Sequence, residues 1–533
     1  MNLLTIFGLI ILIISIIIGV IKFLNIISIL ETNNVDNKSN NKIDEKKGNY
    51  YDLIIVGAGL SGLTAAYESY KISNNSINIL LLETSSHYGG NVKNEIDGIN
   101  LLMPEKLYKD ESGEYIEDNF SSYYDDAFEY GRYLSEKDLL TVLVNNSYEL
   151  YDFLFKDLNC SNLKLIQSEG SKVPRTLIYN NSELTTGKYL TNMIYNKIKN
   201  ISSINISFNS HFIDLIVAED YRQIKGAIYE IQQGEEIINL TVYCKSLILA
   251  CGGYGSDFYD TKESVLKEFL IQYYNLPTFS SFYTQGNGIK IARNKGAILI
   301  DQRQAEIYPT CFVDLLDRFN RHKTLAPDLF RKLGGILMNK RGKRFCNENG
   351  NRRYVAQNIL KNCDIVTDPK IIKQYEGFLI INEEIKEQYG EEIEDYISKG
   401  YLKKYKSFDD FSKQMNISEY YTNIRKSIIN YNQGYDKSRD KYGKDIFPCK
   451  FTMGETIYVG IVTPCIYHTL GGIRINEDAQ VLNEEKRPIK GLFASGEVTG
   501  GIHGVMAMQG NILTQAAVFG RVASKSAVDF IMK

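Results

Sequence analysis

The sequence has no tryptophan, only 9 prolines and only 5 histidines among its 533 residues. It also lacks a basic excess, because 61 Lys and Arg face 64 Asp and Glu and leave a net charge of −3. This balance argues against a nucleic-acid-binding protein, which needs basic residues to neutralise phosphates. The eight cysteines are scattered singly, without CxxC or Cys/His clusters, so c-type haem and structural zinc are not indicated. We expect no metal site, and buried free thiols rather than a disulfide framework.

The N-terminal segment is apolar almost without interruption over residues 3–30. About 20 such residues span a bilayer, so we predict a transmembrane anchor over residues 1–30 and a flexible linker over the polar residues 31–49. A cleaved signal peptide fits less well, because no basic residue precedes the run. Lysines occur late in the run and after it, so the positive-inside rule places the main domain in the cytosol. We therefore predict a single-pass membrane protein, with the ER as one candidate membrane.

Globular sequence begins at residue 50, and its apolar runs end in glycines. "YDLIIVGAG", "INILLLET", "KSLILACGG" and "GLFASGEV" are typical of buried parallel strands, and residues 221–244 predict a hairpin that turns at Gly234. Residues 371–442 are charged and helix-like. Dinucleotide-type elements thus lie at both ends of the globular part. We predict an α/β fold, with a Rossmann-like domain over residues 50–304 and 469–533 and an inserted domain over residues 305–468.

The first strand leads into a GxGxxG turn formed by Gly57, Gly59 and Gly62. These glycines permit a tight turn, close approach of a pyrophosphate, and close packing of helix on strand. Phosphates would bind at the N-terminus of the following helix, where free N–H groups favour anions. Glu83 ends the next strand, 21 residues beyond Gly62, and can accept hydrogen bonds from ribose hydroxyls.

Further glycine loops indicate that the dinucleotide is long. "SSHYGGN" provides a second glycine turn, and "LILACGG" and "FASGE" provide two more at strand ends. Four loops from both ends of the chain would touch one ligand, which favours FAD over NAD.

The chain resembles the soluble fumarate reductase flavoproteins, within the wider fumarate reductase and succinate dehydrogenase flavoprotein superfamily. The likeness extends from residue 50 to the C-terminus through "GAGLSGLTAAYE", "DGIN", "TQGNGIKIARNKGA", "LGGILMNKRGKRFCNE", "YHTLGG" and "GLFASGEVTGGIHG". It implies an FAD domain and an inserted α+β capping domain that hold substrate between them. It also implies hydride transfer from flavin N5 to a carboxylate-activated C=C bond, as in the reduction of fumarate to succinate, with a proton arriving on the opposite face.

The resemblance implies a set of FAD contacts. These are Gly57, Gly59, Gly62, Glu83, Gly90, Asn91, Ala250, Gly252, Gly253, Asn287, Glu497, Asn511 and Ile512. Asn287 stands where the family usually has Asp, so a hydrogen-bonding side chain remains without its charge. Asn91 stands at the offset where membrane-complex relatives attach FAD through His, which predicts non-covalent FAD.

The resemblance assigns the proton donor to Arg352, served by Arg331 and Asp328. Arg331 and Arg352 keep the family's spacing of 21 residues, whereas Asp328 is one methylene shorter than the family's Glu. Arginine is an awkward acid, because its pKa lies above about 12. It can act only against a strongly basic carbanion, with a carboxylate returning the proton. An ordinary ion pair in the capping domain is the alternative for Arg331 and Asp328.

The substrate side matches the family only in part. His468 matches a histidine that hydrogen-bonds substrate carboxylate, and His503 belongs to the closing loop "HGVMA". Tyr308 replaces a substrate histidine, and Ala507 stands where an arginine clamps a carboxylate. Losing one partner of a buried charge pair costs about 2–5 kcal/mol, so we predict a less polar site than fumarate needs. Tyr308 and Asp328 also resemble urocanate reductases, although these keep the clamping arginine.

Three functions remain open on the sequence. The chain is a reductase of fumarate-like alkenes, an enzyme of the same fold with a less anionic substrate such as urocanate or an enone, or a membrane-tethered flavin protein without turnover. Ketosteroid dehydrogenases show that the superfamily includes enzymes of the second kind. No haem, iron–sulfur or quinone motif identifies the electron donor, and reduced flavin or NADH is expected by analogy.

Overall fold

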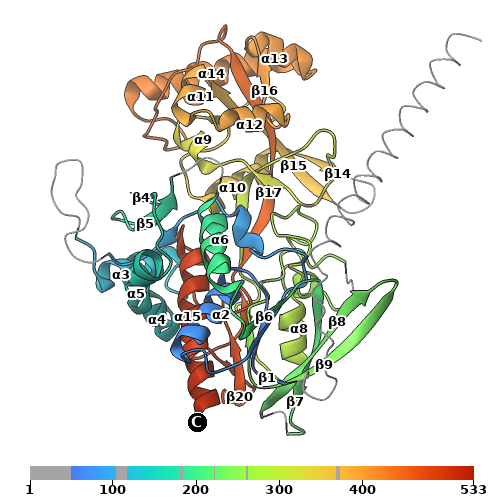
Figure 1. Cartoon of the computed structure of the whole chain (residues 1–533). Helices are drawn as coiled ribbons and strands as arrows, with labels where there is room; N and C mark the ends of the chain where they lie inside the picture. The colour runs from blue at the N-terminus through green and yellow to red at the C-terminus, as the bar shows by residue number, and fades with distance from the viewer. Residues whose placement is uncertain (1–49, 104–116, 181–183, 221, 260–261, 368–371) are drawn as a thin grey trace, which may run out of the picture. The chain divides into compact units, whose positions relative to one another are not determined.

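The computed structural model of the protein describes residues 50–103, 117–180, 184–220, 222–259, 262–367 and 372–533 (Figure 1). The predicted anchor and linker, residues 1–49, lie outside this part of the chain. Among the helices that are described, none has both the length and the apolarity needed to cross a membrane.

The largest sheet assembles the apolar runs that the sequence marks as strands. Eight strands take part, with the order β19-β20-β9-β1-β2-β6 and with β8 and β7 added beside β9. Their bounds are β1 Tyr50–Val56, β2 Ile79–Leu82, β6 Ile204–Ser207, β7 Ser210–Val217, β8 Ile224–Gln233, β9 Glu236–Leu249, β19 Gln480–Leu482 and β20 Pro488–Ala494. β1, β2 and β6 pair in parallel, as do β9 and β20. β8 and β9 form the predicted hairpin, in which Gly234 has a φ of 66°. Two segments far apart in sequence therefore complete one sheet.

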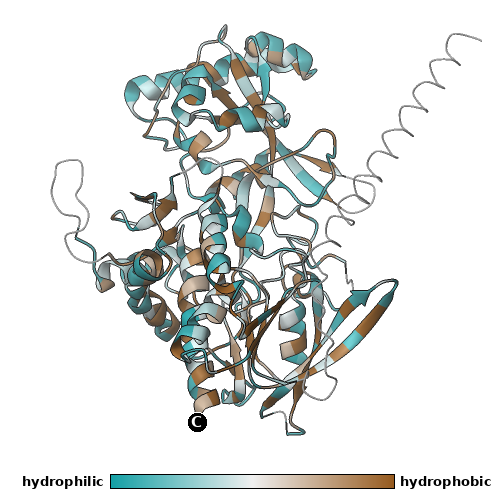
Figure 2. Cartoon of the chain, viewed as in Figure 1, coloured by the Kyte–Doolittle hydropathy of each residue, from teal (hydrophilic) through white to brown (hydrophobic). Residues whose placement is uncertain are grey.

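Helices cover this sheet and lead into its loops. They are α2 Leu60–Ile72, α3 Phe120–Tyr130, α4 Lys137–Ser147, α5 Glu149–Asp152, η2 Phe153–Asp157, α6 Thr186–Ile198, α7 Val265–Phe269, α8 Asn287–Asn294 and α15 Asn511–Met532, with the 3-10 turn η1 Asn91–Asn94. α15 and α2 pack against one another, and both are buried over most of their length. Figure 2 shows the apolar residues concentrated along the strands of this sheet. This distribution fits strands that are covered on both faces.

Two small sheets flank the large one. β3 Ile99–Asn100, β5 Thr176–Tyr179 and β4 Leu163–Ile166 form a three-stranded sheet in that order, and β10 Leu299–Ile300 pairs with β18 Gly472–Ile473. The first of these sheets anchors residues 95–100, which approach the candidate site.

Residues 305–469 form a second, antiparallel sheet with its own helices. Its main order is β12-β11-β17-β15-β13, with β14 beside β15 and β16 beside β17. The strands are β11 Ala305–Phe312, β12 Thr324–Leu325, β13 Ile336–Met338, β14 Asp364–Thr367, β15 Lys373–Asn382, β16 Lys403–Tyr405 and β17 Ile457–Thr469. The helices are α9 Asp328–Lys332, α10 Arg352–Asn362, α11 Glu383–Tyr389, α12 Ile393–Ser398, α13 Phe408–Gln414 and α14 Tyr421–Lys437, with the 3-10 turn η3 Ser418–Tyr420. These elements fill the segment for which an inserted capping domain is predicted.

The pairing of β11 with β17 positions several candidate residues. Glu306 lies opposite His468 in the register, and Tyr308 lies opposite Cys465. The register shifts twice along this pair, next to Ile307 and before Cys311. Glu306 and Tyr308 of β11 both lie near the Arg352 guanidinium, at 3.8 Å for a Glu306 oxygen and 4.8 Å for the Tyr308 ring centroid.

Two expectations from the sequence are wrong in detail. Residues 371–442 contain the strands β15 and β16 as well as helices, because the apolar run "GFLIIN" inside this charged segment is buried in the second sheet. Cys311 and Cys465 form a disulfide across β11 and β17, with Cα atoms 6.3 Å apart. They are 154 residues apart in sequence, so only the pairing of these strands brings them together. The remaining six cysteines are free thiols.

Candidate active site

A cavity of about 330 Å³, called the FAD cavity below, opens at the carboxyl ends of the large sheet. This volume lies in the range of small-molecule and cofactor sites, about 300–1,000 Å³. Nine of the predicted FAD contacts line it. They are Gly57, Gly59, Glu83, Gly90, Asn91, Ala250, Gly252, Glu497 and Ile512. The cavity thus collects loops from both ends of the chain, as the motif spacing predicts.

The glycine turn after β1 leaves a free helix N-terminus at this cavity. Gly57 has a φ of 107°, and a Cβ atom there would collide with the carbonyl oxygen of Ala250. Gly62 lies outside the lining, where a Cβ atom would collide with the Gly57 carbonyl oxygen. α2 begins after Gly59 without a side-chain cap or an acidic residue in its first turn. Its N–H groups can therefore receive a pyrophosphate.

Glu83 is fixed at the end of β2 by the neighbouring backbone. Its Oε2 accepts a hydrogen bond from the N–H of Ala58 at 2.7 Å, and its Oε1 accepts one from the N–H of Ser85 at 2.8 Å. Burial raises the pKa of Glu83, and these N–H donors oppose the shift. Each carboxylate oxygen has a second lone pair for a ribose hydroxyl.

Three more of the predicted FAD contacts, Gly253, Asn287 and Asn511, are not among the residues that line the cavity. A Cβ atom on Gly253 would collide with the hydroxyl of Thr469. Asn287 begins α8, with its Nδ2 3.4 Å from Nε2 of His211. The Asn511 side chain accepts hydrogen bonds from Tyr123 at 2.7 Å and Asn100 at 2.8 Å.

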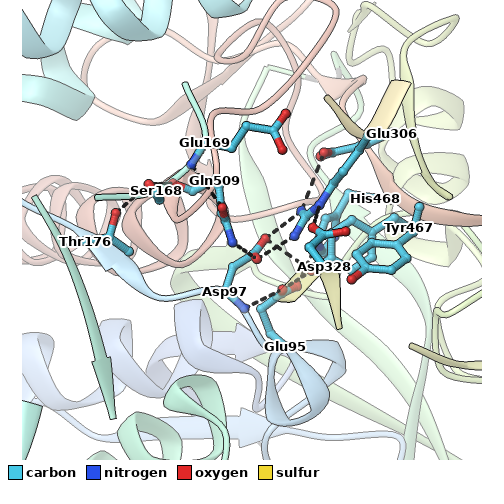
Figure 3. Close-up of polar contacts among 12 residues, drawn as sticks. Glu95, Asp97, Ser168, Glu169, Thr176, Glu306, Asp328, Tyr467, His468 and Gln509 are labelled. Carbon is cyan, nitrogen blue, oxygen red and sulfur yellow. Dashed lines mark hydrogen bonds and ion pairs between the residues drawn. The ribbon is translucent and has the colours of Figure 1, made fainter. Parts of the chain in front are cut away.

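Figure 3 shows the acids Glu95, Asp97, Glu306 and Asp328 gathered in one region, where buried Arg352 is ion-paired with Asp97 and Asp328. Nε of Arg352 donates to Oδ2 of Asp328 at 2.7 Å, and its two terminal nitrogens donate to the two oxygens of Asp97 at 2.7 and 2.8 Å. Asp328 also accepts a short hydrogen bond from Arg331, one turn along α9. The structure thus joins Arg331, Asp328 and Arg352, three of the four predicted catalytic residues, in one continuous row, and the fourth is His468.

The ion pairs in this row fix its protonation states. Burial alone would raise the pKa of Asp328, but Arg352 and Arg331 outweigh burial and hold that pKa well below its ordinary value. Burial alone would lower the pKa of Arg352, yet Asp328 and Asp97 raise it well above its ordinary value. Proton transfer from Arg352 therefore requires an acceptor that is more basic than these carboxylates.

His468 is held between two acids rather than left free. Its Nε2 lies 2.8 Å from Oε2 of Glu95, and its Nδ1 lies 3.4 Å from Oε2 of Glu497. Burial would lower the pKa of His468, but Glu95 and Glu497 raise it well above its ordinary value. Tyr467 also donates a short hydrogen bond to Glu95. The imidazole is therefore a cation whose two nitrogens already have partners.

Three of the four predicted substrate contacts, namely His468, Tyr308 and His503, already have hydrogen-bond partners within the protein. Tyr308 is fully buried, donates to the carbonyl of Ala326 at 3.0 Å, and places its ring 4.8 Å from the Arg352 guanidinium carbon. His503 pairs with Gln515 of α15 at 2.7 Å, and burial lowers its pKa to about 4, so it is neutral.

The fourth contact, Ala507, offers no charge or hydrogen-bonding side chain to a ligand. It is 3% exposed and packs with Leu470 and Ile512 in a small apolar cluster.

Sequence reasoning missed the acids that surround Arg352. Glu95 and Asp97 come from "NEIDGIN", a segment noted only for its "DGIN" motif, and Glu306 comes from β11. Gln509 donates to Oδ1 of Asp97 at 2.7 Å. Two acids beside Gly98 were the available signal, but nothing in the sequence places them against Arg352, which is 255 residues away from Asp97.

These acids correct one expectation. Loss of a clamping arginine at Ala507 predicts a less polar site, but the described site is polar and carries an excess of acid. Its cations are Arg331, Arg352 and His468, and the acids that face them are Glu95, Asp97, Asp328, Glu306 and Glu497.

Comparison with known proteins supports the assignment of the cavity to FAD. Residues 52–513 match the family described as the FAD binding domain. Fumarate reductase 1 of Saccharomyces cerevisiae is 29% identical over 89% of this chain and 98% of its own length. The fumarate reductase of Schizosaccharomyces pombe is 27% identical over 94% of each chain.

Solved structures agree as well. A flavocytochrome c3 fumarate reductase in its open conformation superposes with a TM-score of 0.75 at 25% identity, over 92% of this chain and 80% of its own. The family match covers most of the chain, and the cavity has the glycine cradle and free helix N-terminus that a dinucleotide needs. The chain therefore belongs to the FAD binding domain family, and it is an FAD-dependent, fumarate reductase-like oxidoreductase of the type that acts on CH–CH bonds.

Proposed function

We propose that the protein reduces an activated C=C bond held between the FAD cavity and the second sheet, and that Arg352 supplies the proton. Bound FAD supplies the hydride for such a reaction. The observation that carries the proposal is the continuous buried row from Arg331 through Asp328 to Arg352. An ordinary structural ion pair needs two members, whereas a path that returns a proton to its donor needs a third.

The residues of the row would act in a fixed order. Arg352 donates a proton to the carbanion carbon that forms next to the activating group. Asp328, which is ionised at rest, then accepts a proton from Arg331 and passes it to Arg352, and Arg331 is reprotonated from water. Arg331 also donates to the carbonyl of Glu348 at 2.5 Å, and its Nε has no hydrogen-bond partner among the described residues. A buried donor without an acceptor is unusual, which suits a group that exchanges protons with water or ligand.

We further propose that the substrate is not a dicarboxylate. Fumarate needs cationic clamps at both ends, but Ala507 is apolar, His468 is occupied by Glu95 and Glu497, and Asp97 holds both terminal nitrogens of Arg352. Each missing clamp costs about 2–5 kcal/mol, or roughly 30- to several-thousand-fold in affinity. A less anionic substrate, such as an enone or a monocarboxylate related to urocanate, fits this site better than fumarate.

FAD is proposed to bind non-covalently. Asn91 lies at the cavity wall, where its Oδ1 accepts hydrogen bonds from the N–H of Ser281 at 2.8 Å and the hydroxyl of Thr284 at 3.0 Å. An amide in this role orients a loop and cannot form the bond that a histidine forms with flavin. Acid precipitation should therefore release the whole flavin into the supernatant.

Turnover is tested with the full-length holoenzyme. The flavin is reduced anaerobically, mixed with fumarate, urocanate or an enone, and followed by return of the oxidised-flavin absorbance. Reoxidation by the enone or urocanate but not by fumarate supports the proposal, and rapid reoxidation by fumarate contradicts the substrate assignment. Flavin that no alkene reoxidises, although it reacts with an artificial acceptor, contradicts the enzymatic role. Arg352→Lys should abolish alkene-dependent reoxidation while leaving flavin reduction unchanged.

We propose three further features of the protein. Residues 305–468 act as a capping domain, reduced flavin or NADH serves as electron donor, and residues 1–30 anchor the chain in a membrane. Anaerobic mixing with each donor tests the second, and retention of the full chain in carbonate-washed membranes tests the third.

A further inference from the structure

Glu306 is a buried acid that no cation in the site neutralises by a hydrogen bond. It lies in β11, is 7% exposed, and its nearest cationic partner is a terminal nitrogen of Arg352 at 3.8 Å. No hydrogen bond among the described residues uses its carboxylate. The neighbouring acids differ, since Asp97 and Asp328 accept from Arg352 at 2.7–2.8 Å and Glu95 lies 2.8 Å from His468. A buried ionised carboxylate without such a partner is costly.

The three cations of the site are already committed elsewhere. Arg352 directs all its nitrogens to Asp97 and Asp328, Arg331 contacts Asp328, and His468 lies between two acids. None of them can approach Glu306 more closely without giving up one of these contacts. The negative charge of Glu306 is therefore available to a ligand.

Glu306 lines a small cavity that is separate from the larger FAD cavity. The volume is about 30 Å³, which is close to the share of one water molecule in the liquid. Its walls include Tyr130, Tyr273 and Met506, together with the arginines Arg352 and Arg353. Because Asp97 and Asp328 already pair with Arg352, the aromatic faces and the Glu306 carboxylate suit a small cation better than an anion.

A second acid adds to the negative potential near this cavity. Glu169 accepts a hydrogen bond from the Tyr130 hydroxyl at 2.6 Å. Burial raises the pKa of Glu306 to about 7, with Arg352 and His468 opposing the shift and Asp97 and Glu169 adding to it. A bound cation would reverse the penalty that this burial imposes on the carboxylate.

Arg353 lines the same cavity but does not pair with Glu306. It directs a terminal nitrogen to the carbonyl of Val505 at 3.5 Å, in the loop that also carries Met506. The loop contributes apolar side chains at Met506 and Ala507, so it adds no cation that could reach Glu306. The alternative is that Arg353 moves and pairs with Glu306 itself. The binding experiment below distinguishes this pairing from binding of a ligand cation.

We propose that the substrate carries a cationic nitrogen group, a primary ammonium or a similarly small cation, which binds Glu306 in the cavity walled by Tyr130, Tyr273 and Met506. This rests on the proposed function, because it assigns a substrate class to the same site. The reacting C=C bond would then be positioned by an ion pair of opposite sign to the carboxylate clamp of a fumarate site.

Binding of small probes to the oxidised holoenzyme tests the assignment without turnover. Propylammonium, propanol and propionate are titrated at neutral pH, and the perturbation of the flavin spectrum gives the Kd of each. We expect propylammonium to bind at least about 30-fold more tightly than propanol, which corresponds to roughly 2 kcal/mol. Equal binding of the two, or tighter binding of propionate, would overturn the proposal and would indicate that Arg353 has taken the position of the ligand cation.

Two further measurements assign the effect to Glu306. Glu306→Gln should remove the preference for ammonium and leave propanol binding unchanged, whereas Glu169→Gln should only reduce it. Should Glu306→Gln fail to hold flavin, the native protein still provides the test. Its preference for propylammonium should decline as the pH falls below about 7 and Glu306 becomes protonated. A preference that persists in Glu306→Gln, or that is independent of pH, contradicts the role of Glu306. If ammonium binds but no alkene is reduced, only the proposed reaction fails.

Discussion

Replacing Asp97 by Asn should convert the site toward anion binding. Asp97 holds both terminal nitrogens of Arg352 at 2.7 and 2.8 Å, and the substitution removes one negative charge from the centre of the cluster. At an effective dielectric constant of about 20, a unit charge acts on an anion about 6 Å away with roughly 3 kcal/mol. Side-chain rearrangement will reduce this effect, so we expect fumarate to bind about 10- to 100-fold more tightly to Asp97→Asn than to the native protein.

The assay is titration of the oxidised holoenzyme with fumarate, followed through the flavin spectrum, together with the rate of reoxidation of the reduced enzyme. Breaking a buried pair also costs stability, up to about 3–5 kcal/mol, although Arg352 keeps Asp328 as a partner. Thermal unfolding with flavin fluorescence as the signal measures that loss separately.

Asp126→Asn provides a matched control for this stability loss. Asp126 is equally buried and pairs with Arg175 at 2.8 Å, and Arg175 likewise keeps a second acid, Asp118. We expect a similar fall in the unfolding temperature and no change in fumarate binding. If Asp97→Asn retains flavin and binds fumarate no better than Asp126→Asn, the electrostatic reasoning about this site is wrong.

Four further changes test other parts of the molecule. Ala507→Arg should tighten fumarate binding by about tenfold, and more in the Asp97→Asn background, because the new cation then faces one acid fewer; an unchanged Kd would mean that this loop does not face the substrate. Gly57→Ala should abolish FAD binding, because its Cβ atom has no space and the φ of 107° is strained, and the flavin content of the purified protein measures this. Burial alone would lower the pKa of His468, but the pairing with Glu95 raises it above its ordinary value. The protonated His468 therefore stabilises the fold below its ordinary pKa, and this stability is lost as the pH rises through the raised pKa. The unfolding temperatures of the native protein and of His468→Gln should accordingly converge in alkaline solution. Glu348→Gln, which leaves a buried arginine and lysine without their shared acid, should lower the free energy of unfolding by about 3–5 kcal/mol without changing the flavin spectrum.

The parts of the protein that depend on local rules follow from the sequence. A glycine turn after an apolar strand, with an acid at the end of the next strand, specifies both backbone geometry and ligand. Gly57, Gly59 and Glu83 accordingly lie together at the cavity. The spacing of Arg331 and Arg352 also proved informative, because α9 and α10 present both residues to Asp328.

Side chains that face each other across the two sheets did not follow from the sequence. Glu95 and Asp97 lie more than 250 residues before Arg352, and Glu306 depends on the pairing of β11 with β17 and on the bulges in it. The same pairing forms the Cys311–Cys465 disulfide, which scattered cysteines did not suggest.

The sequence alone determined the cofactor and the fold family, because a dinucleotide is held mainly by backbone groups at glycine turns, and glycine spacing is visible along a single strand–turn–helix unit. Only the tertiary structure decided the charge of the candidate active site. That charge is a sum over residues from distant segments, and Coulomb interactions depend on distances in space rather than on separation along the chain. Reading Ala507 alone suggested a loss of polarity, whereas the folded chain places Glu95, Asp97 and Glu306 around the same cations and gives the site an excess of acid.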